Sequence, residues 1–139
     1  MPTPRDHHGA AVVGDEIVVL AGRDDVTELL TVNEIYSAAS DTWRSSADVP
    51  TGRSGVAAVE REGRVYLFGG EQFEPRGTFD EAERYDPATD SWEALPPMPT
   101  ARHGLGAAVV DGAIHVIAGG PQRGLTYSAV NEVLSTGGD

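Results

Sequence analysis

The sequence repeats itself at an interval of about 49 residues, and this repeat constrains the fold more than any other feature. The stretch "YSAASDTW" contains Tyr36 and Trp43, and "YDPATDSW" contains Tyr85 and Trp92, 49 positions further on. The segments "MPTPR", "VPTGR" and "MPTAR" recur at nearly the same interval. We therefore divide the chain into three similar units, approximately residues 1–48, 49–97 and 98–139, as in proteins built from stacked structural repeats.

Each unit has the pattern of β-structure. Short runs of small and β-branched residues lead through Gly- and Asp-containing turns into apolar strands such as "VYLFGG", and no window keeps a helical period. Four short strands in about 50 residues are typical of a β-propeller blade. We expect inner strands at 8–13, 56–60 and 105–110, second strands at 17–21, 65–69 and 114–118, third strands at 32–37, 82–86 and 130–135, and outer strands only near Trp43 and Trp92. The third unit therefore lacks its outer strand.

The chain resembles the Kelch repeat family over essentially residues 1–135. The resemblance depends on the Pro-x-x-Arg start of each unit, the strand that ends in a glycine pair (Gly69-Gly70), the turn Tyr85-Asp86-Pro87, and the tryptophan seven residues after the tyrosine. It implies an all-β fold of Kelch-type propeller blades, three in this chain. The third unit departs from the family pattern, because Leu134 replaces the tyrosine and no tryptophan follows.

The aromatic residues of the repeat are expected to build the fold. A tryptophan on an outer strand buries a large surface against the next blade, and Asp and Pro suit the turn that precedes it. We therefore assign structural roles to Tyr36, Trp43, Tyr85 and Trp92.

Composition excludes several partners. The net charge of −12 argues against nucleic acid, because binding to a phosphate backbone needs clustered cationic charge. No stretch resembles a membrane span or a signal peptide, so we expect no membrane association. The chain has no cysteine, which removes disulfides and thiol chemistry but leaves the cellular compartment open.

Three blades do not close a propeller, which typically has roughly four to eight. An isolated arc would leave apolar faces of its two terminal blades in water. Two explanations stand at this point. Either two copies form a homodimer that closes a six-bladed ring, as symmetric oligomers commonly do, or the chain is one half of a longer propeller.

The alternating course of the strands brings the start of each unit and the loop between its second and third strands to one rim. Loops on a rigid scaffold are where binding residues concentrate. The resemblance also implies binding at this rim, around the mouth of the channel. Our candidates for a peptide or a small polar ligand are Arg5, Asp6, His7, Arg53, Ser54, Arg102 and His103.

The repeated arginine has two interpretations. Arg5, Arg53 and Arg102 either form a ring that binds carboxylates, or they are buried and tie the start of each blade to a neighbouring carboxylate or carbonyl group. We favour the buried arrangement because the arginine occurs in every unit. The carboxylates of the long loops, such as Glu71 and Glu74, are expected to be solvated.

We predict no catalytic residues, no cofactor and no native metal site. Adjacent histidines in an extended segment, such as His7 and His8, point to opposite sides, and common enzyme motifs are absent. The predicted function is a non-catalytic binding scaffold. The alternative is a Kelch-type carbohydrate-active or sugar-acid isomerising enzyme, and a histidine and a carboxylate that converge in the channel mouth would favour it.

Overall fold

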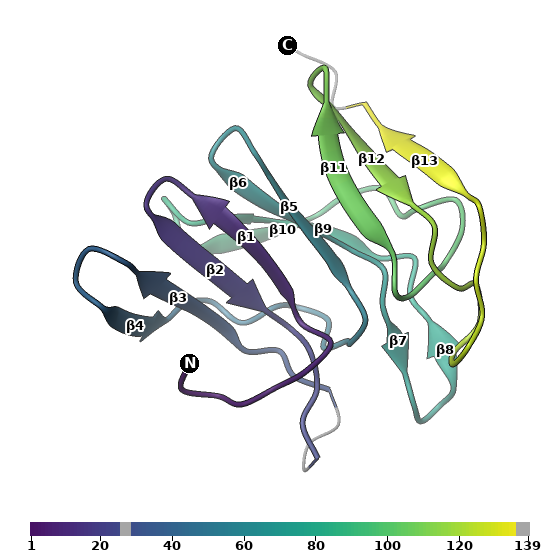
Figure 1. Ribbon diagram of the computed structural model, residues 1–139, viewed down its shortest axis with the longest axis horizontal. Coiled ribbons are helices and arrows are strands. Elements are labelled where there is room, and N and C mark those ends of the chain that lie inside the picture. The colour runs from purple at the N-terminus through teal and green to yellow at the C-terminus, as the bar shows by residue number, and fades with distance from the viewer. Residues whose placement is uncertain (26–28, 136–139) are drawn as a thin grey trace.

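The strands form separate antiparallel sheets that follow one another along the chain (Figure 1). The computed structural model describes residues 1–25 and 29–135. We name the three larger sheets blade 1, blade 2 and blade 3 in chain order. Blade 1 contains β1 (Gly9–Val13), β2 (Glu16–Leu20), β3 (Asn33–Ser37) and β4 (Thr42–Ser45), blade 2 contains β5 (Ala57–Arg61), β6 (Arg64–Phe68), β9 (Ala82–Asp86) and β10 (Ser91–Ala94), and blade 3 contains β11 (Gly106–Val110), β12 (Ala113–Ile117) and β13 (Asn131–Leu134).

The predicted fold class is confirmed. Each strand of the three blades lies within a few residues of its expected position, and blade 3 has three strands in the described part of the chain. The described residues contain no helix, and therefore none that could cross a membrane. One element was not predicted: β7 (Glu71–Gln72) and β8 (Gly77–Thr78) form a small hairpin within the long loop of blade 2.

The hairpin turns follow from the turn residues. Glu62 and Gly63 connect β5 to β6 with φ of 53° and 77°, and Asp111 and Gly112 connect β11 to β12 with φ of 49° and 76°. Two consecutive residues with positive φ match the twist of two-residue hairpin loops. These turns set the register of the two hairpins. Along each strand, alternate side chains therefore point to opposite faces of the sheet.

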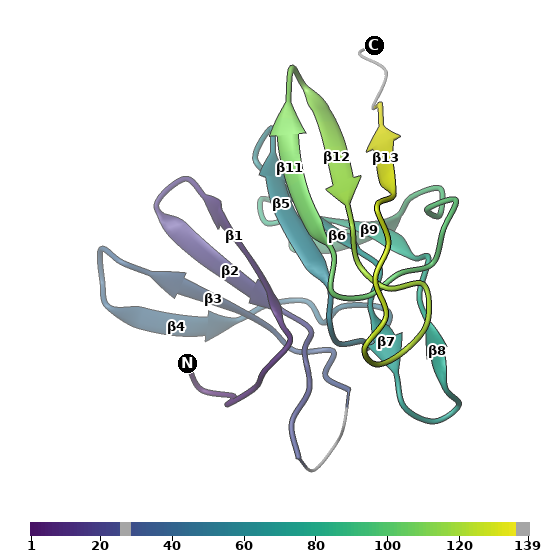
Figure 2. The same cartoon turned by 45° about the vertical axis from the view of Figure 1, so that its right-hand side comes forward.

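The hydrophobic core lies between the blades. Val18, Leu20 and Ile35 of blade 1 pack with Val65 and Leu67 of blade 2. A second cluster joins blade 2 to blade 3, and its members include Tyr66, Phe68, Ile114 and Val116. Figure 2 shows the three sheets standing side by side, with β5 between β1 and β11. Blade 2 is therefore the only one of the three that is covered on both faces by described residues.

The outer faces of blades 1 and 3 remain apolar and exposed. Val12 pairs with Ile17 on the face of blade 1 opposite to the blade 2 contact, and these side chains are 60% and 38% exposed. Val110, Ile117 and Val133 of blade 3 are also exposed, on the face away from blade 2. Contiguous exposed apolar faces mark sites of association.

Candidate functional site

The three repeated arginines are buried. The side chains of Arg5, Arg53 and Arg102 are 0% exposed, and each forms an ion pair with a glutamate on the third strand of its own blade. The distances are 2.6 Å from Arg53 to Glu83 and 2.8 Å from Arg102 to Glu132.

Each of these guanidinium groups also donates to a carbonyl near the end of the second strand. Arg53 Nε donates to Gly69 O at 2.7 Å, and Arg102 Nη1 donates to Ala118 O at 2.5 Å. The arginines thus occupy the buried, intra-blade arrangement, and their side chains present no surface to a ligand. Ligand binding at the rim stays a prediction, and it now depends on the residues next to the three arginines.

The residue after each arginine lies at the rim. Asp6, Ser54 and His103 each form an isolated antiparallel bridge with the residue that follows the glycine at the end of the second strand, namely Arg23, Glu71 and Gly120. Asp6 is exposed, His103 is half-buried and Ser54 is fully buried. The structure therefore brings the predicted candidates to one rim, but Ser54 has no exposed side chain there.

Glu71 connects the three blades at this rim. Its Oε1 lies 3.9 Å from Arg23 Nη1 of blade 1, and its Oε2 lies 3.5 Å from His103 Nδ1 of blade 3. The backbone N–H of Gly124 donates to the same Oε2 at 3.3 Å. The expectation that Glu71 is solvated is wrong: the residue is 5% exposed, because partners from both neighbouring blades surround its carboxylate.

His7 and Asp6 form a more exposed pair on blade 1. His7 Nδ1 lies 3.1 Å from Asp6 Oδ1, and Arg23 Nε donates to the same oxygen at 2.8 Å. The hydrogen bond from Arg23 is the main cause that lowers the pKa of Asp6 below its ordinary value. His7 has a φ of 51°, an uncommon conformation for a residue other than glycine.

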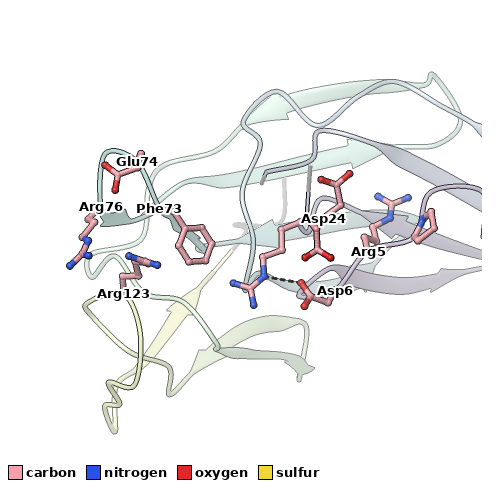
Figure 3. Close-up of a pocket in the computed structure, with 10 residues that line it drawn as sticks. Arg5, Asp6, Asp24, Phe73, Glu74, Arg76 and Arg123 are labelled. Atoms are coloured by element: carbon pink, nitrogen blue, oxygen red, sulfur yellow. Dashed lines mark hydrogen bonds and ion pairs between the residues drawn. The ribbon is translucent and has the colours of Figure 1, made fainter. Parts of the chain in front are cut away.

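A cavity of about 1080 Å³ opens beside these residues. Its walls come from the start of the chain and from the long loops of all three blades. Figure 3 shows Phe73 and Arg123 together at one side, and Asp6 and Asp24 at the other. The lining residues are Pro4, Arg5, Asp6, Arg23, Asp24, Asp25, Phe73, Glu74, Arg76 and Arg123.

Phe73 lies between two guanidinium groups. The Arg123 guanidinium carbon is 3.9 Å from the centre of the ring, and that of Arg23 is 5.2 Å away. Cation–π contacts of this kind hold long arginine side chains in place. Arg76, on the same loop as Phe73, is exposed at the cavity wall. This side of the cavity therefore presents an aromatic ring and fixed positive charge.

Sequence reasoning placed the three long loops at the rim but did not select Arg23, Phe73, Arg76 or Arg123. A signal was present for Arg23, because it aligns with Glu71 directly after the glycine of the second strand. Nothing in the repeat marks Phe73, since it belongs to a loop that differs among the three units.

The structure brings together two histidine–carboxylate pairs, His103 with Glu71 and His7 with Asp6. Within residues 1–25 and 29–135, no group of three or more histidine, aspartate and glutamate side chains is arranged to hold a metal ion.

Comparison with known proteins agrees with the separate antiparallel sheets of the fold. The model of the KLHDC2/KLHL20/DRC7 Kelch-repeats domain matches residues 1–135. Beta-scruin of Limulus polyphemus is 34% identical over 70 residues, which are 50% of this chain and 8% of that protein, and alpha-scruin of the same organism is 36% identical over the same shares. The Kelch-like protein terF of Aspergillus terreus is 37% identical over 71 residues, 48% of this chain and 16% of that protein. The matched segments thus cover only a small part of these relatives. With its repeats, its separate antiparallel sheets and this match over nearly its whole length, the chain belongs to the Kelch-repeat family.

Proposed function

We propose that this chain is a non-catalytic interaction scaffold that binds a peptide segment or a small polar ligand in the rim cavity. Kelch-repeat domains typically serve as protein-interaction scaffolds. The observation that carries the proposal is the cavity of about 1080 Å³, whose walls come from loops of three different blades. Binding sites commonly lie on loops that a rigid scaffold positions.

The charges of the cavity indicate what the ligand carries. On the blade 1 side, the carboxylates Asp6, Asp24 and Asp25 outnumber Arg5 and Arg23. On the opposite side, around Phe73, Arg76 and Arg123 outnumber Glu74. Guanidinium groups pair well with carboxylates, and aromatic rings with apolar or cationic groups. We infer a ligand with an acidic group toward Arg123 and a basic or amide group toward Asp6.

Selection from a random peptide library displayed on phage tests this proposal. Peptides selected on the immobilised protein should lose roughly tenfold or more in affinity with Phe73→Ala or Arg123→Ala, because arginine and aromatic residues dominate binding energy. Arg64→Ala is the charge-matched control, since Arg64 begins β6 at the far end of blade 2 from Glu71. Peptides that bind all three variants equally would place the binding surface elsewhere.

We also propose that two copies close a six-bladed ring. Five exposed residues support this arrangement, because each lies on a face that has no neighbouring blade among the described residues: Val12 and Ile17 of blade 1, and Val110, Ile117 and Val133 of blade 3. A two-fold axis would bring the open face of blade 1 against that of blade 3 of the other copy, twice. The remaining half of a longer chain is the alternative occupant.

Two histidine–carboxylate pairs favour the enzyme alternative, His103 with Glu71 at 3.5 Å and His7 with Asp6 at 3.1 Å. Against the first pair, the Glu71 carboxylate also interacts with Arg23 and the N–H of Gly124, and the side chains of His103 and Glu71 are mostly buried. In the second pair, the same Asp6 oxygen already accepts a hydrogen bond from Arg23. A general base needs access to the proton that it removes. Turnover of a sugar acid, followed by NMR and abolished by His103→Asn, would favour the enzyme. Peptide binding without any turnover supports the scaffold.

A further inference from the structure

The imidazole of His103 lies between two hydrogen-bond acceptors from different blades. Its Nδ1 is 3.5 Å from Glu71 Oε2, at the start of β7 in blade 2, and its Nε2 is 3.0 Å from the carbonyl oxygen of Gln122 in the long loop of blade 3. The side chains of His103 and Glu71 are 12% and 7% exposed, so water competes little for the contact between them. The ring therefore faces one acceptor on each side.

Both acceptors can be satisfied only by the charged form of the ring. A neutral imidazole has one N–H donor and one acceptor nitrogen, whereas the imidazolium donates from both nitrogens. Neutral His103 would turn a lone pair toward either the Glu71 carboxylate or the Gln122 carbonyl, depending on its tautomer. One of the two contacts would then be repulsive. The observed arrangement is therefore the one that protonated His103 stabilises.

The remaining partners of Glu71 do not replace this proton. Arg23 Nη1 lies 3.9 Å from Glu71 Oε1, and the Nε of the same arginine already donates to Asp6 at 2.8 Å. The N–H of Gly124 donates to Glu71 Oε2 at 3.3 Å. These contacts of the carboxylate are longer than the usual hydrogen bond of about 2.7–3.2 Å. A mostly buried carboxylate that loses one of its partners is costly, so Glu71 depends on the charge of His103.

The same contacts hold the wall of the rim cavity. Arg123 lies between Gln122 and Gly124 in the chain, and its guanidinium carbon is 3.9 Å from the ring centre of Phe73, two residues after Glu71 (Figure 3). The uncharged segment Ser54–Gly55 also packs against this site. Through the contacts above, the surrounding charged and titratable groups are Arg23 with Asp6 and His7, Arg123, and the buried pair of Arg102 and Glu132.

We propose that His103 is a pH-sensitive switch that assembles the rim cavity. Its charged form holds Glu71 and Gln122 at once, which keeps Phe73 and Arg123 stacked. Its neutral form releases one of the two groups, so the walls from blade 2 and blade 3 separate. Histidine changes charge between about pH 5 and pH 8, and the cavity is assembled on the acidic side of that change. Control of ligand binding by this switch rests on the proposed function, whereas the movement of the wall is measurable without a ligand.

An NMR titration of the full chain tests the switch. Between about pH 5.5 and pH 8.5, above the range of ordinary carboxylates, the amide signal of Gly124 should shift with the same midpoint as the His103 imidazole. Hydrogen exchange of this amide, corrected for the intrinsic rate at each pH, should be roughly tenfold or more slower at the acidic end, because its acceptor Glu71 is then held in place.

Two variants assign the response to one histidine. His103→Gln is neutral at every pH, so the response of Gly124 should disappear. His7→Gln is the matched control, because His7 also lies at the rim and contacts Arg23, and it should keep the response. A Gly124 signal that does not titrate, that titrates apart from His103, or that still titrates in His103→Gln would overturn the proposal.

Failure of the switch and failure of the proposed function are distinguishable. If His103→Gln does not fold, the midpoints of Gly124 and His103 in the unchanged protein still decide. An intact response in a protein that selects no peptide would support the switch and count against the proposed function alone. Peptide binding by a protein without the response would overturn the switch alone.

Discussion

The two junctions between blades both have an apolar core of inner-strand residues, but they differ at their outer ends. At the junction of blades 1 and 2, the indole N–H of Trp92 donates a hydrogen bond to the Ala47 carbonyl, and Asp90 accepts one from the Ala47 N–H. At the junction of blades 2 and 3, Leu134 stands in place of the tyrosine and a cavity of about 220 Å³ remains. The inner strands and the apolar contacts of the two junctions are otherwise similar. The outer strand therefore closes a junction, and the inner strands alone do not.

The largest effect is expected from a feature that all three blades share on both sides of the junctions, the buried arginine. Arg53→Ala leaves Glu83, which is 5% exposed, without its charged partner. We expect a loss of about 3–5 kcal/mol in the free energy of unfolding, because an unpaired buried charge is costly. Urea unfolding measures it. Arg64→Ala removes a partly exposed pair with Asp86 and should cost no more than about 1 kcal/mol. Equal effects of the two variants would contradict the structural role of Arg53.

Trp92→Ala should make the first junction resemble the second. The indole is half-buried and hydrogen-bonded, so we expect a loss of about 3 kcal/mol, at the lower end for tryptophan truncation. Trp43→Ala is the matched control. Trp43 has the same contact with its tyrosine but lies on the open face of blade 1, so its loss should cost only about 1 kcal/mol at low protein concentration. Denaturant titration of both proteins gives the comparison, and a larger effect at Trp43 would refute it.

Leu134→Tyr should make the second junction resemble the first. A phenol ring in the cavity should raise the free energy of unfolding by about 1 kcal/mol, as cavity-filling substitutions commonly do. Thr42→Tyr places the same ring on an exposed position of β4 in blade 1, away from this cavity, and should change stability by no more than about 0.5 kcal/mol. If Leu134→Tyr destabilises the protein, the cavity is not open to an aromatic ring.

The smallest expected effect is a dependence of stability on acid at the first junction. Hydrogen bonds from the Ala47 N–H and then from the Tyr85 hydroxyl lower the pKa of Asp90. Because the folded pKa is below the unfolded value of about 3.9, this stabilisation is complete above that pH and is lost as pH falls through the lowered pKa. Asp90→Asn keeps a residue that tolerates positive φ. Between pH 5 and pH 3 the unchanged protein should lose more stability than this variant, and identical losses would contradict the account.

The strands of the blades were predicted well because the residues that build them recur in each repeat unit. Tyr85, Trp92 and Arg53 each have equivalents at a fixed interval, so alignment of the units located the strands and favoured buried arginines. The rim cavity was less predictable, because Phe73 and Arg123 belong to loops that differ in each unit. Glu71 was assigned to solvent because its burial depends on Arg23 and His103 from the neighbouring blades, and contacts between blades leave no local pattern. In the sequence, the sign of the cavity between blades 2 and 3 was that Leu134 replaces the tyrosine of the repeat.

The central claim is that the open faces of blades 1 and 3 are covered by a second copy of the chain. Sedimentation velocity at micromolar protein concentration tests it most directly, and we predict a species of twice the chain mass of 14.6 kDa. Val12→Asp, which places a charge on the open face of blade 1, should shift that species toward the monomer. A well-folded monomer of the unchanged protein would contradict the claim, and open-ended aggregates would point instead to a half propeller that pairs with the rest of a longer chain.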